Sequence, residues 1–136
     1  MKITTKTIHH LSQRYNTVGD WIYDEDGNLE ILISDMGNWR QEALVAVHEL
    51  VEALLCSNDG ISQLVVDNFD LALPSTDEDI EPGDHPECPY REQHCMATGI
   101  ERLQAVSFGV DWSKYEDMIE ALSIRYEQSK QQPTNS

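Results

Sequence analysis

A histidine and a glutamate lie one helical turn apart in a long run of residues that lacks proline and glycine. The run extends from Trp39 to Asn58 and contains His48 and Glu52. At about 100° per residue, these two side chains share one face of a helix. The residues around them on that face are Leu44, Val45, Val51 and Leu55. A titratable pair in apolar surroundings costs free energy unless a metal ion, an opposite charge or a hydrogen-bond network satisfies it.

A second helical run, from about Tyr90 to Phe108, carries a matching face with His94 and Glu101. These two residues are seven positions apart, which is about 10 Å along a helix axis. We therefore expect them to reach different levels of a facing helix rather than one common ion. Facing helices with inward histidines and carboxylates build the metal sites of helical bundles. The alternative is a buried hydrogen-bond network that holds no metal.

The five residues His48-Glu49-Leu50-Val51-Glu52 resemble the zincin metallohydrolase signature, a helical His-Glu-x-x-His. In that family the two outer residues bind zinc and the first glutamate activates water. The resemblance implies that His48 and Glu52 are metal ligands and that Glu49 is the general base of a hydrolase. A peptide amide is the substrate class that the family implies.

The signature does not fix the third ligand, and His94 is the best candidate in this chain. Glu101 is expected either as a fourth ligand or as the partner that orients a histidine. Because Glu52 stands where the signature has its second histidine, manganese, iron or magnesium is an alternative to zinc, which remains the first expectation. The chain as a whole also resembles small uncharacterised proteins of phage or prophage type.

Another family suggests a different interpretation of the same helix. Glu49-x-x-Glu52 and, further along, Asp67-x-x-Asp70 resemble the acidic pairs of the all-α nucleotide pyrophosphatases. Those enzymes hold magnesium ions against a triphosphate between successive helices, and magnesium prefers such oxygen ligands. This alternative predicts a magnesium-dependent hydrolase of nucleotides.

Cysteine and histidine side chains suggest a third kind of site, a structural zinc that fastens a loop. The candidates are His85, Cys88, His94 and Cys95. Zinc favours such ligands, but two adjacent residues point about 100° apart on a helix, so His94 and Cys95 cannot easily serve one ion. Another pair, His9 and His10, lies in a segment without a hydrophobic pattern, and we expect it at the surface.

The strands and turns that lead to the first helix follow from residue alternation. Residues 20–35 predict a β-hairpin that turns at Asp26-Gly27. Leu29, Ile31 and Ile33 alternate with other residues after the turn, which is typical of a half-buried strand. The first 14 residues have weak β character and no strong pattern.

The rest of the chain predicts helices and one long loop. Helices are predicted at 39–58, 62–73, 90–108 and from 111 or 113 to 128. The segment 74–89 is an acidic, proline-rich loop, and residues 129–136 form a disordered tail. We therefore expect an α+β, predominantly helical fold: an N-terminal β-hairpin followed by about four helices packed as a small bundle. Residues 1–128 would form a single metal-binding domain.

The charge of the chain excludes several partners. It carries 25 Asp and Glu against 9 Lys and Arg, a net charge of −16 over 136 residues. Such a surface repels phosphate backbones and anionic lipids, so no nucleic acid and no membrane is expected as a partner. The chain lacks an apolar run of transmembrane length and the apolar centre of a signal peptide. Three cysteines form no disulfide framework, which predicts the cytoplasm, or the host cytoplasm if the chain is phage-encoded.

The acidity also supports a non-enzymatic alternative. Six of the 25 acidic residues fall within the loop 74–89. A protein with such a surface would suit a basic protein partner, and electrostatic attraction would speed their association. Neither the substrate nor the oligomeric state follows from the residues.

Overall fold

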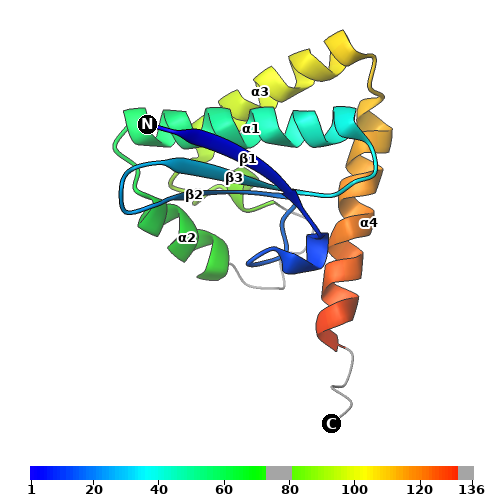
Figure 1. The fold of residues 1–136 in the computed structure, drawn as a ribbon, viewed down its shortest axis with the longest axis horizontal. Coiled ribbons are helices and arrows are strands. Elements are labelled where there is room, and N and C mark those ends of the chain that lie inside the picture. Colours follow the sequence, from blue (N-terminus) through cyan, green and yellow to red (C-terminus); the bar gives the residue numbers. More distant parts are fainter. Residues whose placement is uncertain (73–80, 132–136) are drawn as a thin grey trace.

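The computed structural model describes residues 1–72 and 81–131 of the chain. In that part, a three-stranded N-terminal sheet is followed by four α-helices (Figure 1). The predicted fold class, α+β and predominantly helical, is confirmed. No helix among the described residues is long and apolar enough to cross a membrane.

The sheet has the strand order β1-β3-β2. Its strands are β1 (Ile3–Ile8), β2 (Gly19–Tyr23) and β3 (Leu29–Ser34), and a short 3₁₀ turn, η1 (His10–Ser12), follows β1. β2 and β3 form the predicted antiparallel hairpin, whose turn includes Gly27 at a φ of 78°, a conformation that glycine adopts without strain. Asp24 fastens this turn, because its Oδ1 accepts hydrogen bonds from the backbone N–H groups of Asp26 and Asn28.

β1 is a strand that the sequence pattern did not predict. It pairs in parallel with β3, with Ile3 opposite Leu29 and Ile8 opposite Ser34. Most of its side chains are exposed, so the strand has no buried face that could produce an alternating pattern. Its conformation depends on pairing with the central strand, which is a tertiary contact.

α1 (Trp39–Asn58) has the predicted bounds and packs against β2 and β3. Asn38 caps its first turn, since the side-chain oxygen accepts hydrogen bonds from the backbone N–H groups of Arg40 and Gln41. The helix and the sheet share one apolar core, which includes Leu29, Ile31, Ile33, Leu44 and Val45. This packing fixes the orientation of α1 and therefore of the polar residues on it.

The remaining helical elements are α2 (Gln63–Ala72), the 3₁₀ turn η3 (Pro82–Asp84), α3 (Arg91–Phe108) and α4 (Trp112–Gln131). α3 lies along α1 and ends at Gly109, whose φ of 68° is left-handed (Figure 1). α4 continues three residues beyond the predicted end at Gln128, so the predicted tail begins as helix. Residues 74–80 of the predicted loop and 132–136 of the predicted tail lie outside the described residues.

Candidate metal centre

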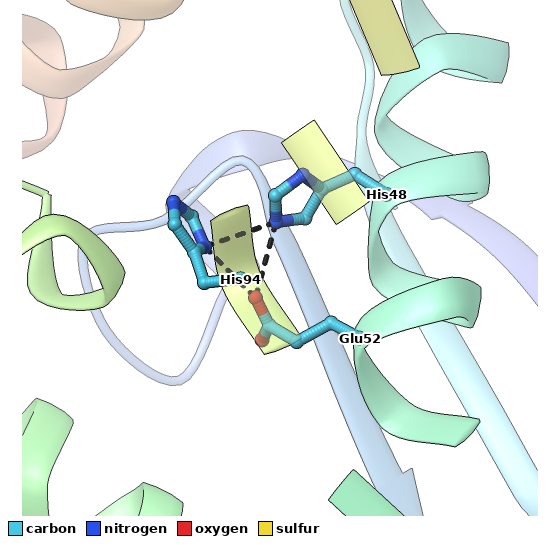
Figure 2. A group of neighbouring side chains, drawn as sticks. All are labelled: His48, Glu52 and His94. Atoms are coloured by element: carbon cyan, nitrogen blue, oxygen red, sulfur yellow. Dashed lines mark hydrogen bonds and ion pairs between the residues drawn. The ribbon is translucent and has the colours of Figure 1, made fainter. Parts of the chain in front are cut away.

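Three side chains from α1 and α3 point toward one another between the two helices (Figure 2). Nε2 of His48 lies 3.1 Å from Oε2 of Glu52 and 3.2 Å from Nδ1 of His94. Nδ1 of His94 lies 2.9 Å from the same Oε2 of Glu52. The three ligand atoms form a group that could hold a metal ion. The structure thus brings together the predicted pair on the first helix and the predicted histidine on the third.

Helix geometry and helix packing explain this convergence. His48 and Glu52 are four residues apart on α1, so they lie one above the other on the same face. α3 packs along that helix and presents His94 to the pair. All three residues are buried, with exposed fractions of 8% for His48, 5% for Glu52 and 6% for His94. Polar atoms this deeply buried need partners, and each residue of the group supplies one for the others.

Other side chains surround the group and satisfy its outward-facing atoms. Nδ1 of His48 lies 2.8 Å from Oε1 of Glu101, and Tyr115 donates its hydroxyl to Oε2 of the same carboxylate at 2.6 Å. Trp21 donates its indole N–H to Oε1 of Glu52 at 3.1 Å. Glu101 therefore contacts the His48 nitrogen that does not face Glu52. Of the two roles expected for Glu101, this geometry matches the one that orients a histidine.

The donor atoms of His48, Glu52 and His94 could hold a divalent metal ion, and zinc serves as the test of fit. Two imidazole nitrogens and one carboxylate oxygen are a ligand set of catalytic zinc sites, which keep a fourth position open. Two ligand atoms of a tetrahedral zinc with bonds of about 2.05 Å are about 3.3 Å apart. The three distances here, 2.9, 3.1 and 3.2 Å, would widen only slightly around such an ion. Manganese and iron accept the same donors, so the residues indicate a divalent metal without identifying it.

Burial and neighbouring carboxylates shift the pKa values of the group in opposite directions. Burial lowers the pKa of His48, but its hydrogen bonds with Glu101 and Glu52 outweigh burial and raise that pKa well above 6.5. For His94, burial is likewise outweighed by the hydrogen bond with Glu52, and the pKa is raised. Burial raises the pKa of Glu52, yet hydrogen bonds with both histidines hold it below its usual range. The group therefore favours positive charge beside ionised carboxylates, which a metal ion would also provide.

Glu49, the predicted general base, follows His48 on α1 and lies half-buried against β2. A Cβ at Gly19 would come within 2.6 Å of its Cγ and 2.7 Å of its Oε1, so glycine makes room for this side chain. Burial, and then the charge of Glu52, raise the pKa of Glu49 well above its usual range. A raised pKa makes the ionised carboxylate a stronger base than an ordinary one.

The acidic pair on α2 has other partners. Arg14 binds Asp67 through two contacts of 3.2 Å, Nη1 to Oδ2 and Nη2 to Oδ1. Asp70 accepts hydrogen bonds from the hydroxyls of Tyr15 and Tyr90. Neither aspartate belongs to a potential metal-holding group within residues 1–72 and 81–131. Among the described residues, no potential metal-holding group joins this pair to the glutamates of α1, as the pyrophosphatase alternative would require.

The cysteines are also separate from the centre. Cys88 is buried and Cys95 is exposed, and no cysteine belongs to a potential metal-holding group in the described part of the chain. His94 instead faces α1, where it completes the group with His48 and Glu52.

Four residues around the centre were not predicted from the sequence: Trp21, Glu81, Asp84 and Tyr115. Oδ1 of Asp84 and Oε2 of Glu81 lie 3.5 and 3.6 Å from Nε2 of His94. In the sequence, Glu81 and Asp84 were marked only as members of the acidic segment before the third helix. Trp21 and Tyr115 had no signal of their own, because aromatic residues are common in any core.

Comparison of the chain with protein-family models, with curated proteins and with solved structures found no match. The geometry of the centre is therefore the basis for a functional assignment.

Proposed function

We propose that this protein is a metal-dependent hydrolase whose divalent ion, zinc in the first instance, is held by His48, Glu52 and His94. The observation that supports it is the convergence of three buried ligand atoms from two helices. The other nitrogen of each histidine faces a carboxylate, Glu101 for His48 and Asp84 with Glu81 for His94. Such outer carboxylates fix the tautomer and the ring orientation of metal-binding histidines.

Each residue around the ion would have a separate role in the reaction. When bound, the ion supplies an open coordination position and lowers the pKa of a water molecule. Glu49 is the group that accepts the proton of the attacking water, as the zincin-like signature implies, and its raised pKa suits that transfer. Glu101 would accept a hydrogen bond from Nδ1–H of His48, which would leave the lone pair of Nε2 free for the ion. Tyr115 holds Glu101 in place.

The substrate class follows from the zincin-like signature, which implies a peptide amide. The strongly acidic surface disfavours nucleic acids and anionic membranes as partners. The three free cysteines, Cys56, Cys88 and Cys95, support a cytoplasmic location, in a host cell if the chain is phage-encoded.

The metal is tested by elemental analysis of protein purified without chelator. We expect at least one transition-metal ion per chain in the wild type and its loss in His48→Ala. Chelation should also lower the thermal stability of the wild type, because binding energy at such a site adds to folding energy. A metal-free wild type whose stability does not change with chelator would refute the proposal.

The chemistry is tested separately with Glu49→Gln. The zinc-loaded wild type is incubated with a defined peptide mixture, and new termini are identified by mass spectrometry. Glu49→Gln should retain its metal and lose the cleavage, whereas Glu120→Gln, which removes an exposed acid from α4, should retain both. Metal-loaded wild type that produces no new termini would refute the peptidase assignment and leave a metal-binding protein.

A further inference from the structure

The imidazole of His94 faces different carboxylates with its two nitrogens. Nδ1 lies 2.9 Å from Glu52 and belongs to the metal centre. Nε2 lies 3.5 Å from Oδ1 of Asp84 and 3.6 Å from Oε2 of Glu81. His94 as a residue is 6% exposed. Its Nε2 thus faces two acidic side chains, at distances longer than those of an ordinary hydrogen bond.

The spacing of these three atoms is that of ligands around an ion. Distances of 3.5 and 3.6 Å exceed those of an ordinary N–H···O hydrogen bond. They are close to the roughly 3.3 Å between two ligand atoms of a tetrahedral zinc. Glu81, Asp84 and His94 form a second group whose ligand atoms all lie within 4.8 Å of one another. Two neighbouring carboxylates are stabilised by positive charge between them, which a protonated His94 or a bound cation would supply.

A glycine allows the turn that carries the two carboxylates to lie against the ring of His94. Gly83 is buried against the ring of His94, and a Cβ at this position would lie 2.2 Å from Cγ and 2.3 Å from Nδ1 of that ring. Only a residue without a side chain allows η3 to lie directly on the imidazole. The carboxylates on either side of it, Glu81 and Asp84, are 60% and 55% exposed, so an ion can reach them from solvent.

We propose that Glu81, Asp84 and Nε2 of His94 form a second site for a divalent cation, and that His94 bridges this ion to the one held by His48 and Glu52. The inference rests on the proposed function, because the first ion uses Nδ1 of the same ring. A nitrogen with two carboxylate oxygens suits zinc, manganese or another borderline cation. When Nδ1 binds the first ion, the remaining ring proton is on Nε2. The second ion replaces this proton on Nε2, and the proton is released to solvent.

The number of ions is the decisive measurement. Chelator-treated full-length chain is titrated with Zn²⁺ by calorimetry in two buffers that differ in ionisation enthalpy, and bound zinc is counted after gel filtration. We expect two ions per chain in the wild type. Binding of the second ion should also release the proton of His94 Nε2, one proton more than a site without a ring proton would release. The double variant E81Q/D84N should bind one ion.

A matched control removes two other acids from the same region. Glu87 and Glu92 are exposed, and neither belongs to a potential metal-holding group among the described residues, so E87Q/E92Q should still bind two ions. Because Glu81 and Asp84 are also exposed, E81Q/D84N should fold, which circular dichroism would verify.

Failure of this inference differs from failure of the proposed function. One ion in the wild type, retained in E81Q/D84N with weaker affinity, would mean that the two carboxylates only orient His94, and it would overturn the second site. Two ions in E81Q/D84N would also overturn it, because the second ion would then lie elsewhere. A wild type that binds no zinc would refute the first site and, with it, the second.

Discussion

Two histidines are buried in different parts of this molecule, and their surroundings differ in charge. His48 lies between α1 and α3 with an exposed fraction of 8%, and each of its nitrogens faces a carboxylate. His10 lies in η1 with an exposed fraction of 3%. Its Nδ1 is 2.8 Å from the hydroxyl of Ser34, and its Nε2 has no hydrogen-bond partner among the described residues. The first histidine has charged partners, and the second has a neutral one.

The difference shows that burial alone does not make a candidate metal site. Burial lowers the pKa of both histidines. For His10 it dominates, and the pKa stays below 6.5. For His48 the carboxylates of Glu101 and Glu52 reverse the shift. A region that stabilises a proton on a histidine in this way also stabilises a metal ion in its place. The surroundings of His10 stabilise neither a proton nor a metal ion on this histidine.

The largest expected difference between the two regions is in zinc binding. His94→Ala removes a ligand of the metal centre, and we expect the affinity for Zn²⁺ to fall by more than the roughly 10- to 100-fold that loss of an outer partner costs. His10→Ala should bind zinc as the wild type does. Calorimetric titration of both variants measures this, and equal loss in the two would show that the comparison is wrong.

The second-largest expected difference between the two regions is in the stability of the metal-free protein. His48→Ala removes the histidine partner of the buried Glu101 and one of the two histidine partners of the buried Glu52, and we expect a loss of about 3–5 kcal/mol. His10→Ala leaves the hydroxyl of Ser34, which Gln13 still contacts at 3.1 Å, and should cost about 1–3 kcal/mol. Urea denaturation in chelator provides the values. Similar losses in His10→Ala and His48→Ala would contradict the role given to charge.

A smaller effect is expected from the outer partners. Glu101→Gln keeps the shape of the side chain and removes its charge, so zinc affinity should fall by about 10- to 100-fold. Ser34→Ala, the equivalent change beside His10, should leave zinc affinity unchanged and lower only the free energy of unfolding, by about 1 kcal/mol. If Glu101→Gln binds zinc with wild-type affinity, the carboxylate has no orienting role.

The smallest effect is a pH dependence of opposite sign in the two regions of the metal-free protein. The raised pKa of His48 stabilises the fold fully below 6.5, and this contribution is lost as pH rises through the folded-state pKa. The lowered pKa of His10 gives a contribution that is present above 6.5 and lost as pH falls. The stability difference from wild type should therefore shrink with rising pH for His48→Gln and grow for His10→Gln. Parallel profiles in urea denaturation would contradict the assigned shifts.

Helical periodicity was sufficient to predict those residues of the candidate site whose position depends on a single helix. His48 and Glu52 were predicted because four-residue spacing places them on one face of α1, and His94 because it lies on the inward face of the next long helix. The seven-residue separation of His94 and Glu101 predicted contacts at different levels of the facing helix, whereas both side chains contact His48, at its two different nitrogens. These inferences needed helix geometry and no knowledge of the tertiary fold.

Residues placed by tertiary contacts could not be predicted in this way. β1 has no buried face, and its strand forms because β3 is beside it. The prediction that His10 lies at the surface was wrong, because η1 is covered by α4, where Tyr126 packs against its ring. Asp84 reaches His94 because a glycine lets a loop lie on the ring, and nothing in the local sequence expresses that contact.

The hydrogen bond from Trp21 to Glu52 gives the metal centre an optical reporter. The indole of Trp21 is buried and donates to a carboxylate that would share its electron density with a bound ion. Trp39, in contrast, is 61% exposed. The emission of Trp21 should therefore respond to occupancy of the centre, and replacing Trp39 and Trp112 with phenylalanine would isolate that signal. Ion binding could then be followed in real time without an attached dye.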